Sequence, residues 1–243
     1  MNNTTPEPRD LGAMRRWELT GGLIYWALLA TGLAYWPARL LTRVLYGTTE
    51  SDNGFLALNL LIYATHVLVL GLLLRRFWLG QLRRFRSRGL RALADLALGF
   101  ALYYGGLLIL DLILAELLPR IPEYGNANQE AVEEIFRLSP FWSGIMACVL
   151  APLAEETLYR GLFFRTLLPK SRLLAYGLSM LLFAGAHVWS HVLNQSLAVT
   201  AVNLVIYMLP GFCLAWVYER SGSLLTSVLL HSVINSFLLL LQP

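Results

Sequence analysis

The chain has 243 residues, of which 57% are hydrophobic and only 14% are charged, and its mean hydropathy is +0.57. Soluble domains carry about a quarter charged residues, so this composition indicates a membrane protein. The net charge of +4 comes from arginines placed between apolar runs, with Lys170 as the single lysine. This placement argues against a nucleic-acid partner and is typical of the cytoplasmic face of a membrane protein.

Apolar segments long enough to cross a bilayer recur along the chain, since a spanning helix needs about 20 apolar residues. The fold class that we predict is all-α, a polytopic bundle of about seven transmembrane helices with short interfacial helices. The expected spans are 19–36, 54–74, 96–118, 141–168, 173–192, 197–218 and 223–241. We expect one integral membrane domain, in which residues 1–138 supply N-terminal helices and loops and residues 139–243 supply the catalytic core.

The basic residues predict the orientation of this bundle. With the N-terminus in the cytoplasm, most of the 19 Lys and Arg residues fall on inner segments, and the run 75–91 is the densest. The Leu, Ala and Arg content favours a bacterial cytoplasmic membrane. The first apolar stretch is long and aromatic for a signal peptide, so a retained helix is favoured over a cleaved one.

The longest polar loop on the expected outer side covers residues 119–139. Glu130, Glu133 and Glu134 fall on a short predicted helix in this loop, and Ser139-Pro140 is expected to open the next span. The loop is interpreted as a solvated connector, and a role in substrate gating is the alternative.

Three short stretches of the C-terminal half place polar side chains inside apolar spans. They are "AEETLYRGLFF" (154–164), "FAGAH" (183–187) and "HSVIN" (231–235). Ionisable groups inside a membrane are costly, so they are candidates for function. Glu156 and Arg160 are four residues apart and can pair on one helix face, whereas Glu155 points about 100° away and faces elsewhere.

Three of these side chains are expected at similar depths in the membrane. At the helical rise, Glu155, His187 and His231 lie about 15, 21 and 12 Å from the inner boundary, near the middle of a core about 30 Å thick. A carboxylate, two imidazoles and the amide of Asn235 at similar depth suit water activation and oxyanion stabilisation. Each cluster alone has a structural alternative: an ion-pair network, a hydrogen-bonded histidine, or polar contacts between helices.

Other cleavage chemistries fit the sequence less well. No His-Glu-x-x-His string is present, and the stretch around Ser179 lacks the second glycine of a serine-protease motif. Asp95 and Asp111 fall on one helix and cannot face each other as an aspartyl pair. The remaining polar residues of the spans are expected to be structural or interfacial: Asn59, His66, Asp95, Asp111, Glu116 and His191.

The three stretches match, in order and spacing, the motifs E-E-x-x-x-R, F-x-x-x-H and H-x-x-x-N, and "YERSGSLLTSVLLHSVIN" (218–235) leads into the last one. This part of the chain, about residues 140–240, resembles the CPBP (Abi) family. That family contains type II CAAX prenyl endopeptidases and bacteriocin-processing or immunity proteins. The N-terminal 120 residues resemble it only as generic membrane helices.

The resemblance implies a glutamate-type intramembrane endopeptidase. In the family mechanism, Glu155 would be the general base with His187 assisting, and His231 and Asn235 would polarise the scissile carbonyl. The residues implied to support the site are Glu156, Arg160 and Phe183.

This mechanism needs no cofactor, although Glu155, His187 and His231 could instead bind Zn²⁺ with a water in the open position. The expected partners are membrane lipids and a peptide or protein substrate with a lipidated or transmembrane segment. Two alternatives remain: a non-catalytic immunity or scaffold protein that binds a peptide in the same cavity, and a proton-coupled transporter that uses Glu155 and His187 as a relay.

Overall fold

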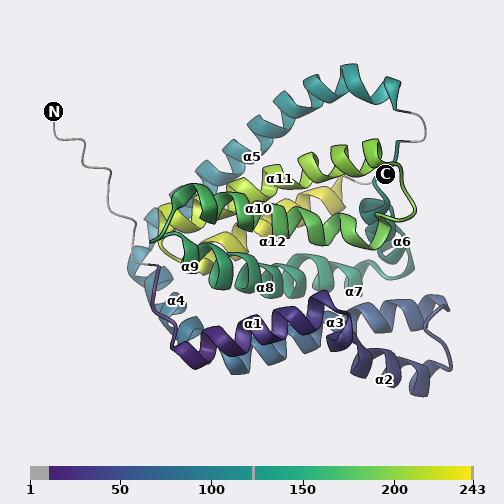
Figure 1. The fold of residues 1–243 in the computed structure, drawn as a ribbon, viewed down its shortest axis with the longest axis horizontal. Coiled ribbons are helices and arrows are strands. Elements are labelled where there is room, and N and C mark those ends of the chain that lie inside the picture. The colour runs from purple at the N-terminus through teal and green to yellow at the C-terminus, as the bar shows by residue number, and fades with distance from the viewer. Residues whose placement is uncertain (1–10, 122–123, 242–243) are drawn as a thin grey trace.

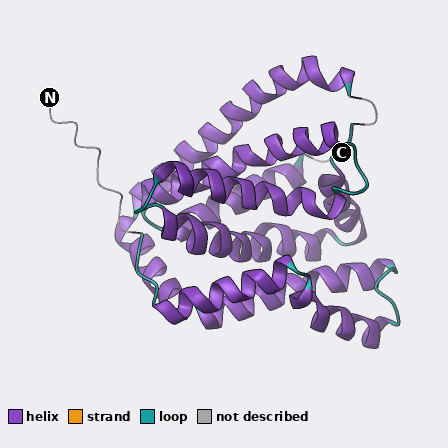
Figure 2. Cartoon of the chain, in the orientation of Figure 1, coloured by secondary structure: helices purple, strands orange, loops and turns teal. Residues whose placement is uncertain are grey.

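The computed structural model describes residues 11–121 and 124–241, and within these ranges the regular secondary structure is entirely helical (Figure 2). The predicted all-α class is confirmed. Most helices run along the long axis of the molecule and lie side by side (Figure 1). They are α1 (Arg16–Ala30), α2 (Trp36–Tyr46), α3 (Asp52–Leu73), α4 (Arg75–Arg88), α5 (Leu90–Leu117), α6 (Ala127–Leu138), α7 (Pro140–Ile145), α8 (Ala151–Glu156), α9 (Arg165–Leu167), α10 (Arg172–Val188), α11 (Leu197–Ser221) and α12 (Leu224–Leu240).

The helices form a membrane bundle, but the expected count of seven spans is not confirmed. In the described ranges, four helices are long and apolar enough to cross a membrane by length and composition: α3, α5, α10 and α11. A bent pair of helices at the N-terminus makes a fifth if it counts as one span. The last apolar helix, α12, has only 17 residues, and the segment expected at 141–168 is divided into α-helical and π-helical pieces.

The first span breaks earlier than expected. Helix α1 ends at Ala30, and the following helical segment, Leu33–Tyr46, turns by 85°. Gly32 has φ 78°, a left-handed conformation that ends a helix easily because glycine has no Cβ. Helix α2 then begins at Trp36, and Pro37 lies in its first turn, where the missing N–H costs nothing. The segment 19–36 is therefore a helix and a corner instead of one straight span.

The core is centred on α10, α11, α12 and the segment 140–167. Its fully buried side chains include Leu162, Phe164, Leu214, Tyr218 and Leu230. Helix α5 packs on the outside of α11 and α12, and α1 and α3 pack on the opposite side of the core (Figure 1).

A glycine permits the close approach of α5. A Cβ at Gly99 would lie 2.2 Å from Cγ2 of Val217, so only glycine fits at this contact.

The polar connection before the core is helical, as expected. Helix α6 carries Glu130, Glu133 and Glu134, and α7 begins at Pro140. Part of the loop, residues 122–123, lies outside the described ranges.

Candidate active site

The segment that carries Glu155 is an irregular helix. Helix α8 lies between two π-helical segments, Met146–Leu150 and Thr157–Phe164. π-Helical turns are rare and occur frequently at functional sites. Carbonyls in these segments bind side chains of other helices: Ala147 O accepts from Asn235 Nδ2 at 2.7 Å, and Tyr159 O accepts from Ser179 Oγ at 3.1 Å. Ser179 thus has a structural partner, and the π segments tie the glutamate-bearing helix to α10 and α12.

The expected pair between Glu156 and Arg160 is present and completely buried. Nη1 of Arg160 lies 2.9 Å from Oε1 of Glu156, and both side chains are fully shielded from solvent. Nη2 of Arg160 donates to the carbonyl of Gly211 in α11 at 2.8 Å. The guanidinium carbon lies 4.5 Å from the ring centroid of Phe183, so this aromatic ring packs beside the pair.

Glu156 also holds His231 in place. Its Oε1 lies 3.1 Å from Nδ1 of His231, and its Oε2 accepts from the hydroxyl of Ser227 at 2.6 Å. Because a carboxylate can only accept, Nδ1 of His231 carries a hydrogen. Glu156 is therefore satisfied by a guanidinium, an imidazole and a hydroxyl, and it fixes the orientation of the imidazole.

His187 is oriented in a similar way from its own helix. Its Nδ1 lies 2.8 Å from the carbonyl oxygen of Phe183, which is an acceptor, so this nitrogen also carries a hydrogen. The ring of Tyr207 stacks on His187 with a centroid distance of 4.5 Å and an interplanar angle of 25°. Backbone and aromatic contacts thus direct the Nε2 atom of His187 away from α10.

The Nε2 atoms of both histidines converge on Glu155. Oε2 of Glu155 lies 3.8 Å from Nε2 of His187 and 4.0 Å from Nε2 of His231. Oε1 accepts a hydrogen bond from the hydroxyl of Tyr63 at 3.3 Å, whereas Oε2 is buried and has no hydrogen-bond partner among the described residues. Polar groups at such separations are commonly bridged by water. The arrangement can hold one water between a carboxylate and two imidazoles.

Asn235 is placed one turn after His231 in α12, as its spacing predicts. Its amide donates to the carbonyl of Ala147, and no described contact links it to Glu155. A primary amide has two N–H groups, so one remains available for another acceptor. The structure therefore brings Glu155, His187 and His231 together and sets Asn235 at the edge of this group.

A short segment around the start of α6 is hydrogen-bonded to Tyr207 and Asn203 of α11. The hydroxyl of Tyr207 donates to Oδ1 of Asn126 at 3.0 Å and accepts from Nδ2 of Asn128 at 2.9 Å. The carbonyl of Gly125 accepts from Nδ2 of Asn203 at 2.9 Å. Residues 124–128, which we call the strap, are thereby attached to α11 directly beside the ring that stacks on His187.

Three residues around the site escape the sequence motifs: Tyr63, Ser227 and Tyr207. Ser227 precedes His231 by four residues, so helical spacing alone could have identified it. Tyr63 and Tyr207 stand on other helices, and nothing in their local sequence marks them.

Two polar residues that were expected to be structural have structural partners. Asp95 accepts from Nε of Arg220 at 2.7 Å. His66 is buried and its Nδ1 lies 2.9 Å from the hydroxyl of Tyr25.

The fit to a metal ion can be judged from the donor atoms. Among residues 11–121 and 124–241, no three His, Cys, Asp or Glu side chains are grouped closely enough to hold a metal ion. Glu155, His187 and His231 are the set with suitable chemistry, since zinc binds such nitrogen and oxygen donors at about 2.0–2.2 Å. The distances of 3.8 and 4.0 Å join the Glu155 oxygen to the two histidine nitrogens. These ligand atoms would have to move closer together to bind one zinc ion.

Comparisons with known proteins point to the same part of the chain. Residues 137–237 match the family described as type II CAAX prenyl endopeptidase Rce1-like. The chain is 23% identical over 118 residues to "Putative membrane peptidase YdiL" of Bacillus subtilis (strain 168), covering 48% of this chain and 43% of that protein. It is 28% identical over 92 residues to "UPF0177 protein YxdF" of Lactococcus lactis subsp. lactis (strain IL1403), covering 37% and 44%.

The chain thus spans less than half the length of either curated relative. No solved structure matches it significantly. The residues that match the family model include Glu155, His187, His231 and Asn235.

Proposed function

We propose that this chain, whose residues 137–237 match the family described as type II CAAX prenyl endopeptidase Rce1-like, is an intramembrane endopeptidase that uses a water activated by Glu155 and His187. The observation that carries the proposal is the convergence of two imidazole Nε2 atoms on Oε2 of Glu155, which has no hydrogen-bond partner in the described part of the chain. A structural ion pair would be closed by direct hydrogen bonds, as Glu156 and Arg160 are. Glu155 instead keeps one oxygen available for a reacting molecule.

The reaction follows from the roles that the geometry allows. A water between Glu155 and His187 loses a proton to the carboxylate while its oxygen attacks the scissile carbonyl carbon. The carbonyl oxygen becomes negative and is stabilised by the N–H of Asn235 and by an N–H at Nε2 of His231, so His231 acts with a hydrogen on both ring nitrogens. When the carbon–nitrogen bond breaks, the proton on Glu155 passes to the leaving amine, and the enzyme returns to its starting state.

The membrane bundle restricts the class of substrate. The side chains of Glu155, His187 and His231 are only 14%, 17% and 5% exposed, and they lie among apolar helices. A substrate must therefore reach them from within or beside the bilayer. We propose that the substrates are peptides with a lipidated or transmembrane segment, such as leader peptides or C-terminal sorting tails. We also propose that the N-terminus of this protein lies in the cytoplasm.

The test is cleavage of a mixed library of lipidated and transmembrane peptides in liposomes, with products identified by mass spectrometry. The wild type is compared with Glu155→Gln, which keeps the shape of the side chain and removes its charge. Glu50→Gln is the matched control because Glu50 is exposed on a loop. We expect cleavage by the wild type and by Glu50→Gln, and none by Glu155→Gln.

Addition of a chelator distinguishes metal-free water activation from water activation by a bound zinc ion. Cleavage that needs Glu155 and survives chelator supports the metal-free mechanism. Cleavage that is lost with chelator and restored by zinc overturns it and assigns Glu155, His187 and His231 as metal ligands. Equal cleavage by wild type and Glu155→Gln would contradict both. Retention of library peptides without cleavage would favour a non-catalytic binding protein.

A further inference from the structure

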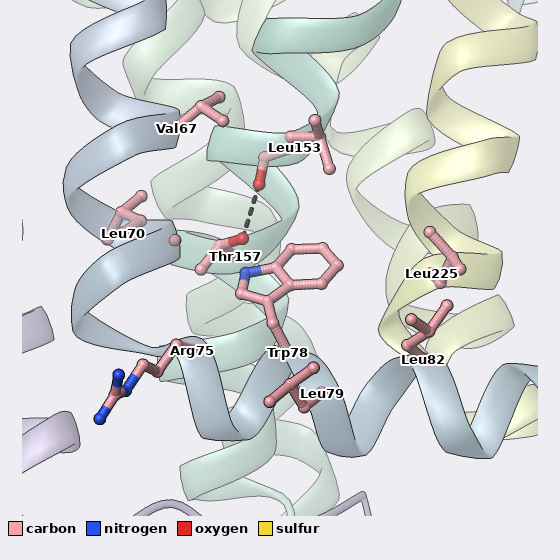
Figure 3. Close-up of a pocket in the computed structure, with 10 residues that line it drawn as sticks. Val67, Leu70, Arg75, Trp78, Leu79, Leu82, Leu153, Thr157 and Leu225 are labelled. Carbon is pink, nitrogen blue, oxygen red and sulfur yellow. Dashed lines mark hydrogen bonds between the residues drawn. The ribbon is translucent and has the colours of Figure 1, made fainter.

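A groove lies beside the segment that carries Glu155, because Leu153 and Thr157 line it, at the arginine-rich end of the bundle. Helix α4 passes across the ends of α3 and α12 and beside the segment that carries Thr157, and the groove lies between them (Figure 3). Its volume is about 420 Å³, within the range of sites that hold small molecules. Its walls are mainly apolar: Val67, Leu70, Trp78, Leu79, Leu153 and Leu225.

The groove faces the surface and offers little to a polar ligand. Leu79 is 54% exposed, so the cavity opens outward at α4. The hydroxyl of Thr157 is already used, because it donates to the carbonyl of Leu153 at 2.6 Å. A hydrocarbon chain from the surrounding bilayer fits these walls.

The edge of the groove is positively charged, which favours a ligand with a negative charge. Helix α4 contains several arginines and no acidic residue. The stem of Arg75 borders the groove, and its guanidinium is turned away from the cavity beside the corner between α3 and α4 (Figure 3). Arg75 is exposed and forms no ion pair with a described residue. A long basic side chain in this position reaches the level of lipid head groups.

We propose that this groove binds an anionic membrane phospholipid, with one acyl chain between α3, α4 and α12 and the phosphate on Arg75. Lipid tails are as apolar as leucine, so the chain alone would not select one lipid over another. The guanidinium supplies the selection, as basic pockets between membrane helices do for anionic head groups. The bound chain would contact Leu153 and Thr157, which flank the two glutamates of α8.

The test uses the purified full chain in nanodiscs made from equal parts of phosphatidylglycerol and phosphatidylcholine. Native mass spectrometry measures which lipids stay bound after release from the disc. Arg75→Gln should lower the ratio of retained phosphatidylglycerol to phosphatidylcholine by about fivefold. Arg76→Gln is the matched control, because Arg76 is the adjacent exposed arginine and does not line the groove.

A second pair of variants tests the groove itself. Gly71 lines it, and a Cβ at Gly71 would meet no atom within 4 Å, so Gly71→Leu fills the cavity without a clash at the backbone. Gly80 in α4 has equally open surroundings and is not part of the groove, which makes Gly80→Leu the control. We expect Gly71→Leu to lose lipid retention and Gly80→Leu to keep it.

Two outcomes overturn the proposal. Equal loss of the lipid ratio in Arg75→Gln and Arg76→Gln would show diffuse attraction to a basic surface. Unchanged phospholipid retention in Gly71→Leu would show that no phospholipid chain occupies the groove. If the same variant then cleaved lipidated peptides more slowly, the groove would be assigned to the lipid of the substrate. Lipid retention is measured without substrate, so failure of this proposal and failure of the proposed peptidase activity are separate results.

Discussion

The Nδ1 atom of His231 lies 3.1 Å from the Oε1 atom of Glu156, although 75 residues separate the two in the chain. The same oxygen receives the guanidinium of Arg160 at 2.9 Å. One buried carboxylate thereby joins α12 to the segment that carries Glu155, and it sets the direction in which the His231 imidazole points. The relation resembles the orientation of a catalytic histidine by a buried acid.

Loss of Arg160 should destabilise the fold strongly. Arg160→Ala leaves Glu156 buried without its cationic partner, and we expect the free energy of unfolding to fall by about 3–5 kcal/mol. The measurement is unfolding in mixed micelles with increasing dodecyl sulfate. Arg172→Ala is the control: it removes an arginine that also pairs with a glutamate, but its side chain is 57% exposed, so about 1 kcal/mol or less is expected. Similar losses in both variants would contradict the structural role of the buried pair.

The hydroxyl of Tyr63 should hold the carboxylate of Glu155 in its catalytic position. It donates to Oε1 at 3.3 Å, and hydrogen bonds to charged groups contribute about 1.5–3 kcal/mol. We expect Tyr63→Phe to lower kcat about tenfold or more and to leave the fold intact. Tyr104→Phe is matched to it, since the buried hydroxyl of Tyr104 has no hydrogen-bond partner among the described residues. An unchanged kcat in Tyr63→Phe would remove this tyrosine from the positioning of Glu155.

Asn235 should stabilise the transition state of peptide cleavage. Removing one oxyanion donor typically lowers kcat by about 10² to 10³, and this loss is expected for Asn235→Ala. Asn235 also donates to Ala147, so the thermal midpoint must be recorded beside kcat. Asn59→Ala is a suitable control because Asn59 likewise donates to a backbone carbonyl, that of Phe55 in its own helix. If kcat falls only as far as the loss of stability explains, the oxyanion role is wrong.

The stacked ring of Tyr207 should matter more than its hydroxyl. Tyr207→Ala removes the ring that lies on His187, whereas Tyr207→Phe keeps the ring and breaks only the bonds to Asn126 and Asn128. Aromatic contacts of this kind contribute about 0.5–1.5 kcal/mol, so Tyr207→Ala should have a kcat up to about tenfold below that of Tyr207→Phe. Steady-state cleavage kinetics measure both. Equal kcat values, with a changed KM in both, would assign the strap to substrate entry instead.

The sequence by itself determined the fold class and the ion pair between two residues of one helix. Its apolar composition indicates a membrane bundle, because long apolar helices are stable in lipid only when every backbone group is bonded internally. The spacing of Glu156 and Arg160 predicts their pair, and the structure confirms it. These inferences succeeded because they depend on helical periodicity and on the cost of burying charge, both of which are local properties.

The tertiary structure alone decided how these residues meet. The bend after Ala30 and the π-helical turns around α8 interrupt segments that are mainly apolar, so the count of straight spans could not be read from hydropathy. The contact of Tyr63 with Glu155 joins residues 92 positions apart. A motif records spacing along one helix, whereas the direction of a side chain across a bundle depends on how neighbouring helices are rotated and how closely they approach.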